Sequence, residues 1–175
     1  TPEAATVSYT YDLAGRKLTE TDARNNTTTN VYDDAGRLFS VRDAVGNITE
    51  YGYNGKGERT SMKDAKLRTT TYTYDARGRQ LTTIFPDGKS VTKTYDGIGL
   101  ALTSKDEEDR TTTFGYDAAS QLISVTDALN QITRYEYDTN GNKTAQVDAR
   151  ANRTTYEYDK LNRRTKRTLP LGQFE

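Results

Sequence analysis

The sequence predicts an all-β protein built from tandem antiparallel β-hairpins that form a twisted, spiralling strip. Three observations lead to this prediction. A tyrosine returns every 21 residues without insertion or deletion, turn-forming residues return about every ten residues, and the segments between the turns are rich in Thr, Val, Tyr and Leu. Gly and Asn recur too often for an apolar period near 3.6 to survive, so helix is not expected.

The repeating tyrosine defines eight copies of the repeat. In such an array each unit packs mainly on its neighbours, so the expected partners of each repeat are the adjacent repeats of the same protein. We expect a single array over residues 1–175, with a first copy that is partial at its N-terminus and an atypical last copy. The chain begins at Thr1 rather than Met, and we expect it to be a segment of a longer protein. The repeating tyrosines are Tyr11, Tyr32, Tyr53, Tyr74, Tyr95, Tyr116, Tyr137 and Tyr158.

A first turn follows each repeating tyrosine. Asp stands directly after the tyrosine in all copies but the third, which has Asn54, and Gly comes three residues later except where Ser120 and Asn162 replace it. Asp at the first turn position accepts hydrogen bonds from the backbone N–H groups that follow, and Gly or Asn tolerates the left-handed conformation that closes the loop. The remaining motif residues are Asp12, Gly15, Asp33, Gly36, Gly57, Asp75, Gly78, Asp96, Gly99, Asp117, Asp138, Gly141 and Asp159.

A second turn begins ten residues after the first. It opens with Asp22, Asp43, Asp64, Asp106, Asp127 and Asp148, and three residues later it has Asn25, Gly46, Gly88, Asp109, Asn130 and Gly172. Leu67 and Ala151 break this pattern. Two turns in each repeat predict two strands in each repeat.

Alternation along the strands predicts which face is buried. In the segment 70–74, one face carries Thr70, Tyr72 and Tyr74, and the other carries Thr71 and Thr73. Only 33% of the residues are hydrophobic and the mean hydropathy is −0.93, so a thick two-layer core is not expected. We therefore expect the tyrosine face to be the inner face and the tyrosines to supply the core.

The other strand of each repeat has an apolar register of its own. We expect its Leu or Ile side chains to lie between the tyrosines of successive repeats and to make aromatic–aliphatic cross-strand contacts. These residues are Leu18, Phe39, Leu81, Leu102 and Ile123, followed two residues later by Val41, Met62 and Val125.

The composition excludes several function classes. The 25 basic and 25 acidic residues balance, which removes the electrostatic reason to expect nucleic acid or an anionic membrane, and no apolar run is long enough to cross a bilayer. The chain has no His and no Cys, so the common catalytic triads and His-based zinc sites are excluded. We expect no catalytic residue, no cofactor and no metal, and hence no enzyme.

Three alternatives compete with a purely structural interpretation. The stretch 138–142 and the acidic cluster 106–109 resemble parts of a calcium loop, although both match the ordinary repeat turn. Exposed tyrosines suit stacking on sugar rings, so glycans are the alternative partner. The basic cluster Lys160, Arg163, Arg164, Lys166 and Arg167 suggests either an anionic partner or an edge strand protected from pairing, and self-association through strand edges is the remaining option.

The combined motif resembles a known family. Tyr32-Asp33-Asp34-Ala35-Gly36-Arg37, followed by Asp43-Ala44-Val45-Gly46-Asn47, is similar to the YD repeats of Rhs proteins, and the resemblance covers essentially the whole chain. The Arg after Gly is kept only as Arg16, Arg37, Arg79 and Arg163.

The resemblance implies a secreted or surface-exposed bacterial Rhs protein, or a relative such as the insecticidal toxin complexes and the animal teneurins. In these proteins the repeats wind a β-strip into a hollow shell, which in the toxin members encloses a C-terminal toxic domain. No aspartyl self-cleavage signature of the Rhs core region is found in the chain. The expected function is therefore a non-catalytic wall segment of such a shell, and the alternative is a carbohydrate-binding adhesion repeat.

Overall fold

The computed structural model describes residues 6–170, which contain β-strands and turns and no helix that could span a membrane. Gly172 of the expected second turn lies outside the described residues. The strands are β1 (Ser8–Tyr11), β2 (Lys17–Thr21), β3 (Thr27–Tyr32), β4 (Leu38–Arg42), β5 (Ile48–Tyr53), β6 (Arg59–Lys63), β7 (Thr69–Tyr74), β8 (Gln80–Ile84), β9 (Ser90–Tyr95), β10 (Ala101–Lys105), β11 (Thr111–Tyr116), β12 (Leu122–Thr126), β13 (Ile132–Tyr137), β14 (Lys143–Val147), β15 (Arg153–Tyr158) and β16 (Arg164–Thr168).

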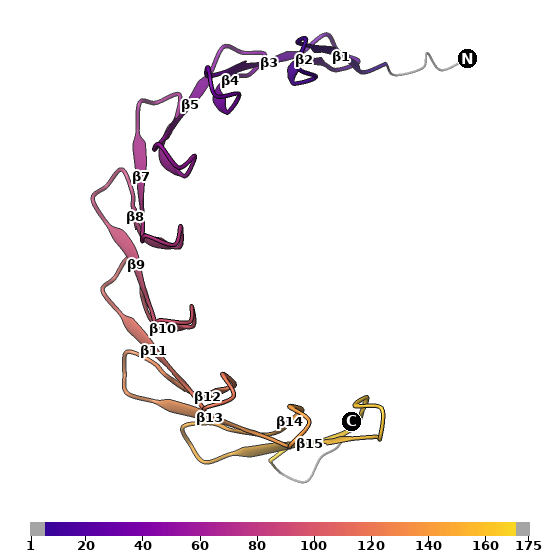
Figure 1. The fold of residues 1–175 in the computed structure, drawn as a ribbon, viewed down its shortest axis with the longest axis vertical. Helices are drawn as coiled ribbons and strands as arrows, with labels where there is room; N and C mark the ends of the chain where they lie inside the picture. Colours follow the sequence, from indigo (N-terminus) through magenta and orange to yellow (C-terminus); the bar gives the residue numbers. More distant parts are fainter. Residues whose placement is uncertain (1–5, 171–175) are drawn as a thin grey trace. The chain divides into compact units, whose positions relative to one another are not determined.

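The strands follow one another in sequence order in one open antiparallel sheet, which confirms the predicted all-β hairpin array (Figure 1). The chain divides into two units, residues 1–90 and 91–175. Within each unit, the strands contact their neighbours in the sequence. Each odd-numbered strand ends at a repeating tyrosine, and the following even-numbered strand completes the hairpin of that repeat.

Both turns of the repeat are five-residue loops of the same kind. In the first loop the N–H of Asp12 donates to the carbonyl of Arg16, and the N–H of Gly15 donates to the carbonyl of Asp12. The fourth residue of the loop adopts the left-handed conformation, with φ of 78° at Gly15. Leu67 and Ala151, which break the sequence pattern, adopt the same conformation with φ of 61° and 64°. The loop therefore forms even where no Gly or Asn favours it.

A β-bulge recurs in every hairpin beside the repeating tyrosine. In the third hairpin Gly52 pairs with Ser61, but Tyr53 pairs with Arg59, so Thr60 is an extra residue in β6. The equivalent register shift occurs in all eight hairpins. The extra residues are Leu18, Phe39, Thr60, Leu81, Leu102, Ile123, Thr144 and Thr165.

The bulge corrects the expected packing of the even-numbered strands. Five residues of the predicted apolar register are extra residues, namely Leu18, Phe39, Leu81, Leu102 and Ile123, and Phe39, Leu102 and Ile123 stay exposed, Phe39 to 46%. Met62 and Val125, which were expected two residues later, pair with Tyr51 and Phe114. Strict alternation fails at this point because a bulge gives one strand an additional residue without a partner in the ladder. The expected packing is therefore wrong for the exposed Phe39, Leu102 and Ile123, whereas Met62 and Val125 do lie opposite an aromatic residue.

The tyrosines do not form a buried core. The register places Tyr51, Met62, Thr70 and Tyr72 on one face, which we call the tyrosine face, as the alternation predicts. Most tyrosine side chains there are half-buried, and none of the described large side chains is fully buried. The buried residues among residues 6–170 are Ala145 and Thr70. A single sheet leaves both of its faces partly open, so the contacts between repeats must hold the array together.

Candidate functional site

The repeat motif places a carboxylate at the start of each first turn, where the loop itself uses it. Oδ1 of Asp12 accepts the N–H groups of Ala14 and Arg16, each at 2.9 Å, while Oδ2 accepts the Arg16 guanidinium at 2.6 Å. Asn54 reproduces the backbone part of this arrangement, because its Oδ1 accepts the N–H groups of Lys56 and Glu58. The second turn uses the same contacts, with the Asn47 amide donating to Oδ2 of Asp43 at 2.7 Å.

In the structure, each predicted motif residue occupies the same position in every repeat. The tyrosine ends an odd-numbered strand, the Asp or Asn opens the loop, and the residue three positions later has a positive φ. Ser120 and Asn162, which replace Gly, have φ of 64° and 59°. The sequence analysis did not identify the fifth loop residue as the side-chain partner of the turn carboxylate. The recurrence of Arg or Asn at that position is the sequence signal that could have shown this role.

Hydrogen bonds lower the pKa of the turn carboxylates of Asp12 and Asp43 and hold them in the ionised form. The backbone N–H of Arg16 is the first cause that lowers the pKa of Asp12, and partial desolvation opposes it. At Asp43 the side-chain amide of Asn47 is the first cause of the lowered pKa. Hydrogen bonds to the charged form of a carboxyl favour that form, so these groups act as fixed acceptors rather than as proton donors at neutral pH.

The hydroxyl group of the repeating tyrosine connects successive repeats. The hydroxyl of Tyr53 donates to the carbonyl of Leu38, the first residue of the preceding even-numbered strand, at 2.9 Å. Four further junctions have the same bond, each with a separation of 15 residues. The donors in these four are Tyr32, Tyr74, Tyr137 and Tyr158, and the respective acceptors are Lys17, Arg59, Leu122 and Lys143.

The Arg after the turn Gly also reaches the next repeat. The guanidinium of Arg37 lies 4.8 Å from the ring centre of Tyr53 and donates to the carbonyl of Asn54 at 3.0 Å. Arg16 lies 4.9 Å from the ring centre of Tyr32. Cations over aromatic faces contribute about 0.5–1 kcal/mol at exposed sites. The Asp–Arg pair of one turn thus supports the tyrosine of the following repeat.

The first residue of the even-numbered strand supplies a second cation in several repeats. The bulge sets Arg59 opposite Tyr53, and its guanidinium lies 5.7 Å from the ring centre of Tyr51 and 5.0 Å from that of Tyr72. Lys143 lies in the same way between Tyr135 and Tyr156. Cations therefore bridge the aromatic rings of successive repeats at these two junctions. The bulge was not visible in the alternation, so these contacts were missed.

The calcium-like stretch 138–142 has the ordinary turn geometry. Oδ1 of Asp138 accepts the N–H groups of Asn140 and Asn142, and Oδ2 accepts the Asn142 amide. In the cluster 106–109, Asp106 pairs with Arg110 and Asp109 pairs with Lys105. Within residues 6–170 no three His, Cys, Asp or Glu side chains gather as metal ligands would.

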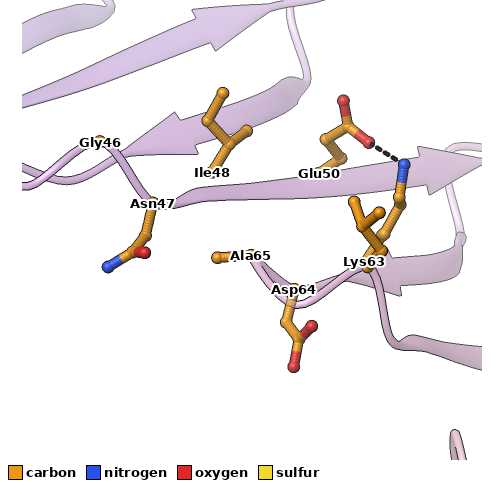
Figure 2. Close-up of a pocket in the computed structure, with 8 residues that line it drawn as sticks. Gly46, Asn47, Ile48, Glu50, Lys63, Asp64 and Ala65 are labelled. Atoms are coloured by element: carbon orange, nitrogen blue, oxygen red, sulfur yellow. Dashed lines mark ion pairs between the residues drawn. The ribbon is translucent and has the colours of Figure 1, made fainter.

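Shallow hollows recur between neighbouring second turns. Figure 2 shows one of them, lined by residues that include Asn47, Glu50, Lys63 and Ala65, with the ion pair between Glu50 and Lys63 marked. Its volume is about 250 Å³, and the ion pair is 3.3 Å long. A second hollow is lined by the equivalent residues four repeats later in the chain, among them Asn130 and Ala151. These hollows are open to solvent and hold ordinary turn residues, and an exposed ion pair contributes at most about 1 kcal/mol.

The sequence pattern of the RHS Repeat family matches residues 32–66, 95–129, 116–153 and 137–173, which together make up well over half of the chain. Among curated proteins, none matches. Solved structures with the same fold include TcdB2-TccC3 without its hypervariable C-terminal region, which is 15% identical with a TM-score of 0.74 and a coverage of 94% of this chain. The Photorhabdus luminescens Tc holotoxin pore carrying the TccC3-D651A mutation is 17% identical, with a TM-score of 0.55 and a coverage of 97%.

The present chain spans 11% of the TcdB2-TccC3 chain and 13% of the holotoxin chain. At these identities the likeness concerns the fold. The 21-residue motif, the hairpin array and the match to the family pattern agree with one another. The chain belongs to the RHS repeat family.

Proposed function

We propose that the chain is a non-catalytic structural module, a wall segment of a secreted or surface Rhs-type β-shell. The observation that carries this proposal is the tyrosine hydroxyl bond, which joins one repeat to the preceding one at five junctions. The motif directs its polar groups to the fold itself, since turn carboxylates accept backbone N–H groups and five tyrosine hydroxyls donate to backbone carbonyls. A module of this kind would add strands to the sheet that forms the wall of the shell.

The comparisons support a place within a much longer protein. The similar TcdB2-TccC3 chain is about nine times as long as the part that this chain matches, because the match covers 11% of it. We propose that the parent protein is bacterial, and that its shell encloses or presents a C-terminal toxin or effector domain. The array of residues 1–175 would then form one section of the wall.

Protease protection in the full-length parent protein tests this function. The domain that follows the repeats should resist protease in the intact protein and become sensitive when two junctions are weakened by Tyr53→Ala and Tyr74→Ala. The control is Leu13→Ser, at an exposed turn tip. Equal digestion rates in the wild type and the junction variant would contradict an enclosing wall, whereas resistance in the wild type alone supports it.

The carbohydrate-binding alternative has less support. Tyr53 is engaged on its ring by Arg37 and through its hydroxyl by Leu38, so part of its surface is not open to a sugar. A glycan array probed with the purified chain tests the alternative. Specific binding that is lost on substituting the exposed Tyr9 and Tyr11 would favour an adhesion repeat over a wall segment.

A further inference from the structure

Side chains connect the first turns of successive repeats directly to one another. The amide of Asn142, at the fifth position of its loop, donates to Oδ1 of Asn162 in the next first loop at 2.8 Å. The ammonium group of Lys56 donates to the carbonyl of Ala76, also in the next first loop, at 3.0 Å. Each partner lies 20 residues later in the chain. At these junctions the first turns are therefore linked along one edge of the sheet.

Gly at the fourth loop position leaves room for the fifth side chain of the preceding first loop. A methyl group at Gly36 would lie 2.9 Å from Nη1 of Arg16, and one at Gly78 would lie 2.8 Å from Oε1 of Glu58. Gly57 has a similar positive φ of 83°, but a methyl group there would meet nothing within 4 Å. The positive φ explains Gly at all three positions, whereas at Gly36 and Gly78 the neighbouring repeat also requires it.

The sequence follows the same rule from one repeat to the next. Wherever the fifth residue of a first loop is Arg, Glu or Gln, the following first loop has Gly at its fourth position. The two exceptions to Gly, Ser120 and Asn162, follow the shorter Leu100 and Asn142. At the second of these junctions the two Asn side chains form the hydrogen bond that replaces the close approach to Gly. The two positions are therefore matched across the junction.

The second turns use their fifth residue differently. The amide of Asn47 donates to Asp43 of its own loop at 2.7 Å, and the amide of Asn152 donates to Asp148 of its own loop at 2.9 Å. Hollows that are open to solvent lie between consecutive second turns, for example beside Ala65. The two edges of the sheet thus differ, although their loops have the same backbone conformation.

We infer that the fifth residue of each first loop is a positioning residue for the next repeat. It sets the spacing of the repeats along the first-turn edge, and the second-turn edge stays able to open by local separation of neighbouring hairpins. Repeat arrays are held together by nearest-neighbour contacts, so a contact present at one edge makes each junction stiffer at that edge. In a wall built from such repeats, opening of one edge changes the curvature of the sheet and keeps the order of its strands.

A double-mutant cycle in urea unfolding tests the positioning role. Gly78→Ala should lower the ratio of folded to unfolded protein for two reasons: Ala is strained at a φ of 80°, and its methyl group displaces Glu58. With Glu58→Ala already present, only the strain remains. The effect of Gly78→Ala should then be roughly three- to tenfold smaller, as expected for two residues in contact. Circular dichroism verifies that each variant retains its strands.

The pair Arg37 and Gly57 is the matched control. Gly57 has the same loop position and a φ of 83°, but the Arg37 guanidinium donates to the carbonyl of Asn54 instead of lying against the Gly. The effect of Gly57→Ala should therefore be the same, within about twofold, with and without Arg37→Ala. A coupling between Glu58 and Gly78 no larger than that of the control pair would overturn the positioning role.

Hydrogen exchange of the native chain tests the difference between the two edges. The N–H of Gly78 in a first turn and the N–H of Leu67 in a second turn both donate to the Asp carbonyl of their own loop, at 3.1 and 2.9 Å. Local opening should expose Leu67 more often, so its protection factor should be at least about tenfold lower. Glu58→Ala should lower the protection of Gly78 and leave that of Leu67 unchanged. Equal protection at the two turns, or a Gly78 amide unaffected by Glu58→Ala, would contradict the inference.

Discussion

Replacing Tyr53 by Phe tests whether the hydroxyl contact stabilises the array. The substitution removes the bond to the carbonyl of Leu38, which is 2.9 Å long and partly buried. A hydrogen bond of this kind contributes about 1 kcal/mol to the free energy of unfolding. The ring, the contact with Arg37 and the strand register stay in place. We expect Tyr53→Phe to lower the free energy of unfolding by about 1 kcal/mol.

Replacing Tyr53 by Ala removes the ring as well. Truncating a fully buried aromatic side chain costs about 3–5 kcal/mol, and a half-buried ring should cost roughly half of that. The lost contact with the Arg37 guanidinium adds about 0.5–1 kcal/mol. Together with the hydroxyl, the expected loss for Tyr53→Ala is about 3–4.5 kcal/mol.

Urea unfolding followed by circular dichroism measures both variants, with the denaturant slope as a check that the same surface unfolds. Tyr11→Phe is the matched control, because Tyr11 is 57% exposed, so its loss should stay within about 0.5 kcal/mol. A Tyr53→Phe variant as stable as the wild type would refute the assignment of the hydroxyl as the connection between repeats.

Four further outcomes are expected. Leu67→Gly should raise the free energy of unfolding by about 1 kcal/mol in urea titrations, because Leu67 has a φ of 61° that Gly adopts without strain, and a loss of stability would contradict this. The pKa of turn carboxylates such as Asp43 is lower in the folded chain, first through the amide of Asn47, than the unfolded value of about 3.9. Their stabilisation is therefore complete above pH 5 or so and is lost as the pH falls below about 4; a melting temperature that does not fall with acid would argue against it. Tyr74→Ala should destabilise by about 3 kcal/mol and Thr73→Ala by less than about 0.5 kcal/mol, and equal losses would reverse the two faces. Calcium or a chelator should leave the melting temperature unchanged, and an upward shift of several degrees with calcium would reveal a metal site.

Most of the fold follows from the period and the turn residues. Asp at the first loop position prefers to accept the backbone N–H groups of the turn, and Gly at the fourth position favours a positive φ. These two preferences determine the loop conformation independently of how the strands pack. The period then fixes the order of the strands, because each hairpin has only its neighbours to pair with. These preferences are local, so they can be inferred without knowledge of the packing.

The junctions could not be inferred in the same way. The bulge at Thr60 adds one residue to β6, so alternation along the strand does not show that Arg59 lies opposite Tyr53. Arg59 appears in the sequence as an isolated basic residue at a strand start. Its position between Tyr51 and Tyr72 depends on the pairing register, which no local pattern specifies.

The stagger of the hairpins explains why a hydroxyl is needed at the junction. Between β2 and β3 the paired register runs from Thr21 with Thr27 to Thr19 with Thr29. Lys17, at the start of β2, lies beyond this ladder, and its carbonyl accepts the hydroxyl of Tyr32 instead of a backbone N–H. The tyrosine side chain thus continues the hydrogen bonding between repeats where the backbone ladder stops.

This role accounts for the different variability of the two aromatic positions. The position two residues before the repeating tyrosine accommodates Asn30, Lys93 and Phe114, because a ring there serves mainly to cover the sheet and contact a cation. The repeating position is Tyr in all eight copies and never Phe. Phe would supply the same apolar area, so area alone does not explain the choice. A partly buried carbonyl that lost its donor would carry a desolvation cost of about 1–3 kcal/mol. At five junctions the donor to this carbonyl is the tyrosine hydroxyl, which Phe lacks.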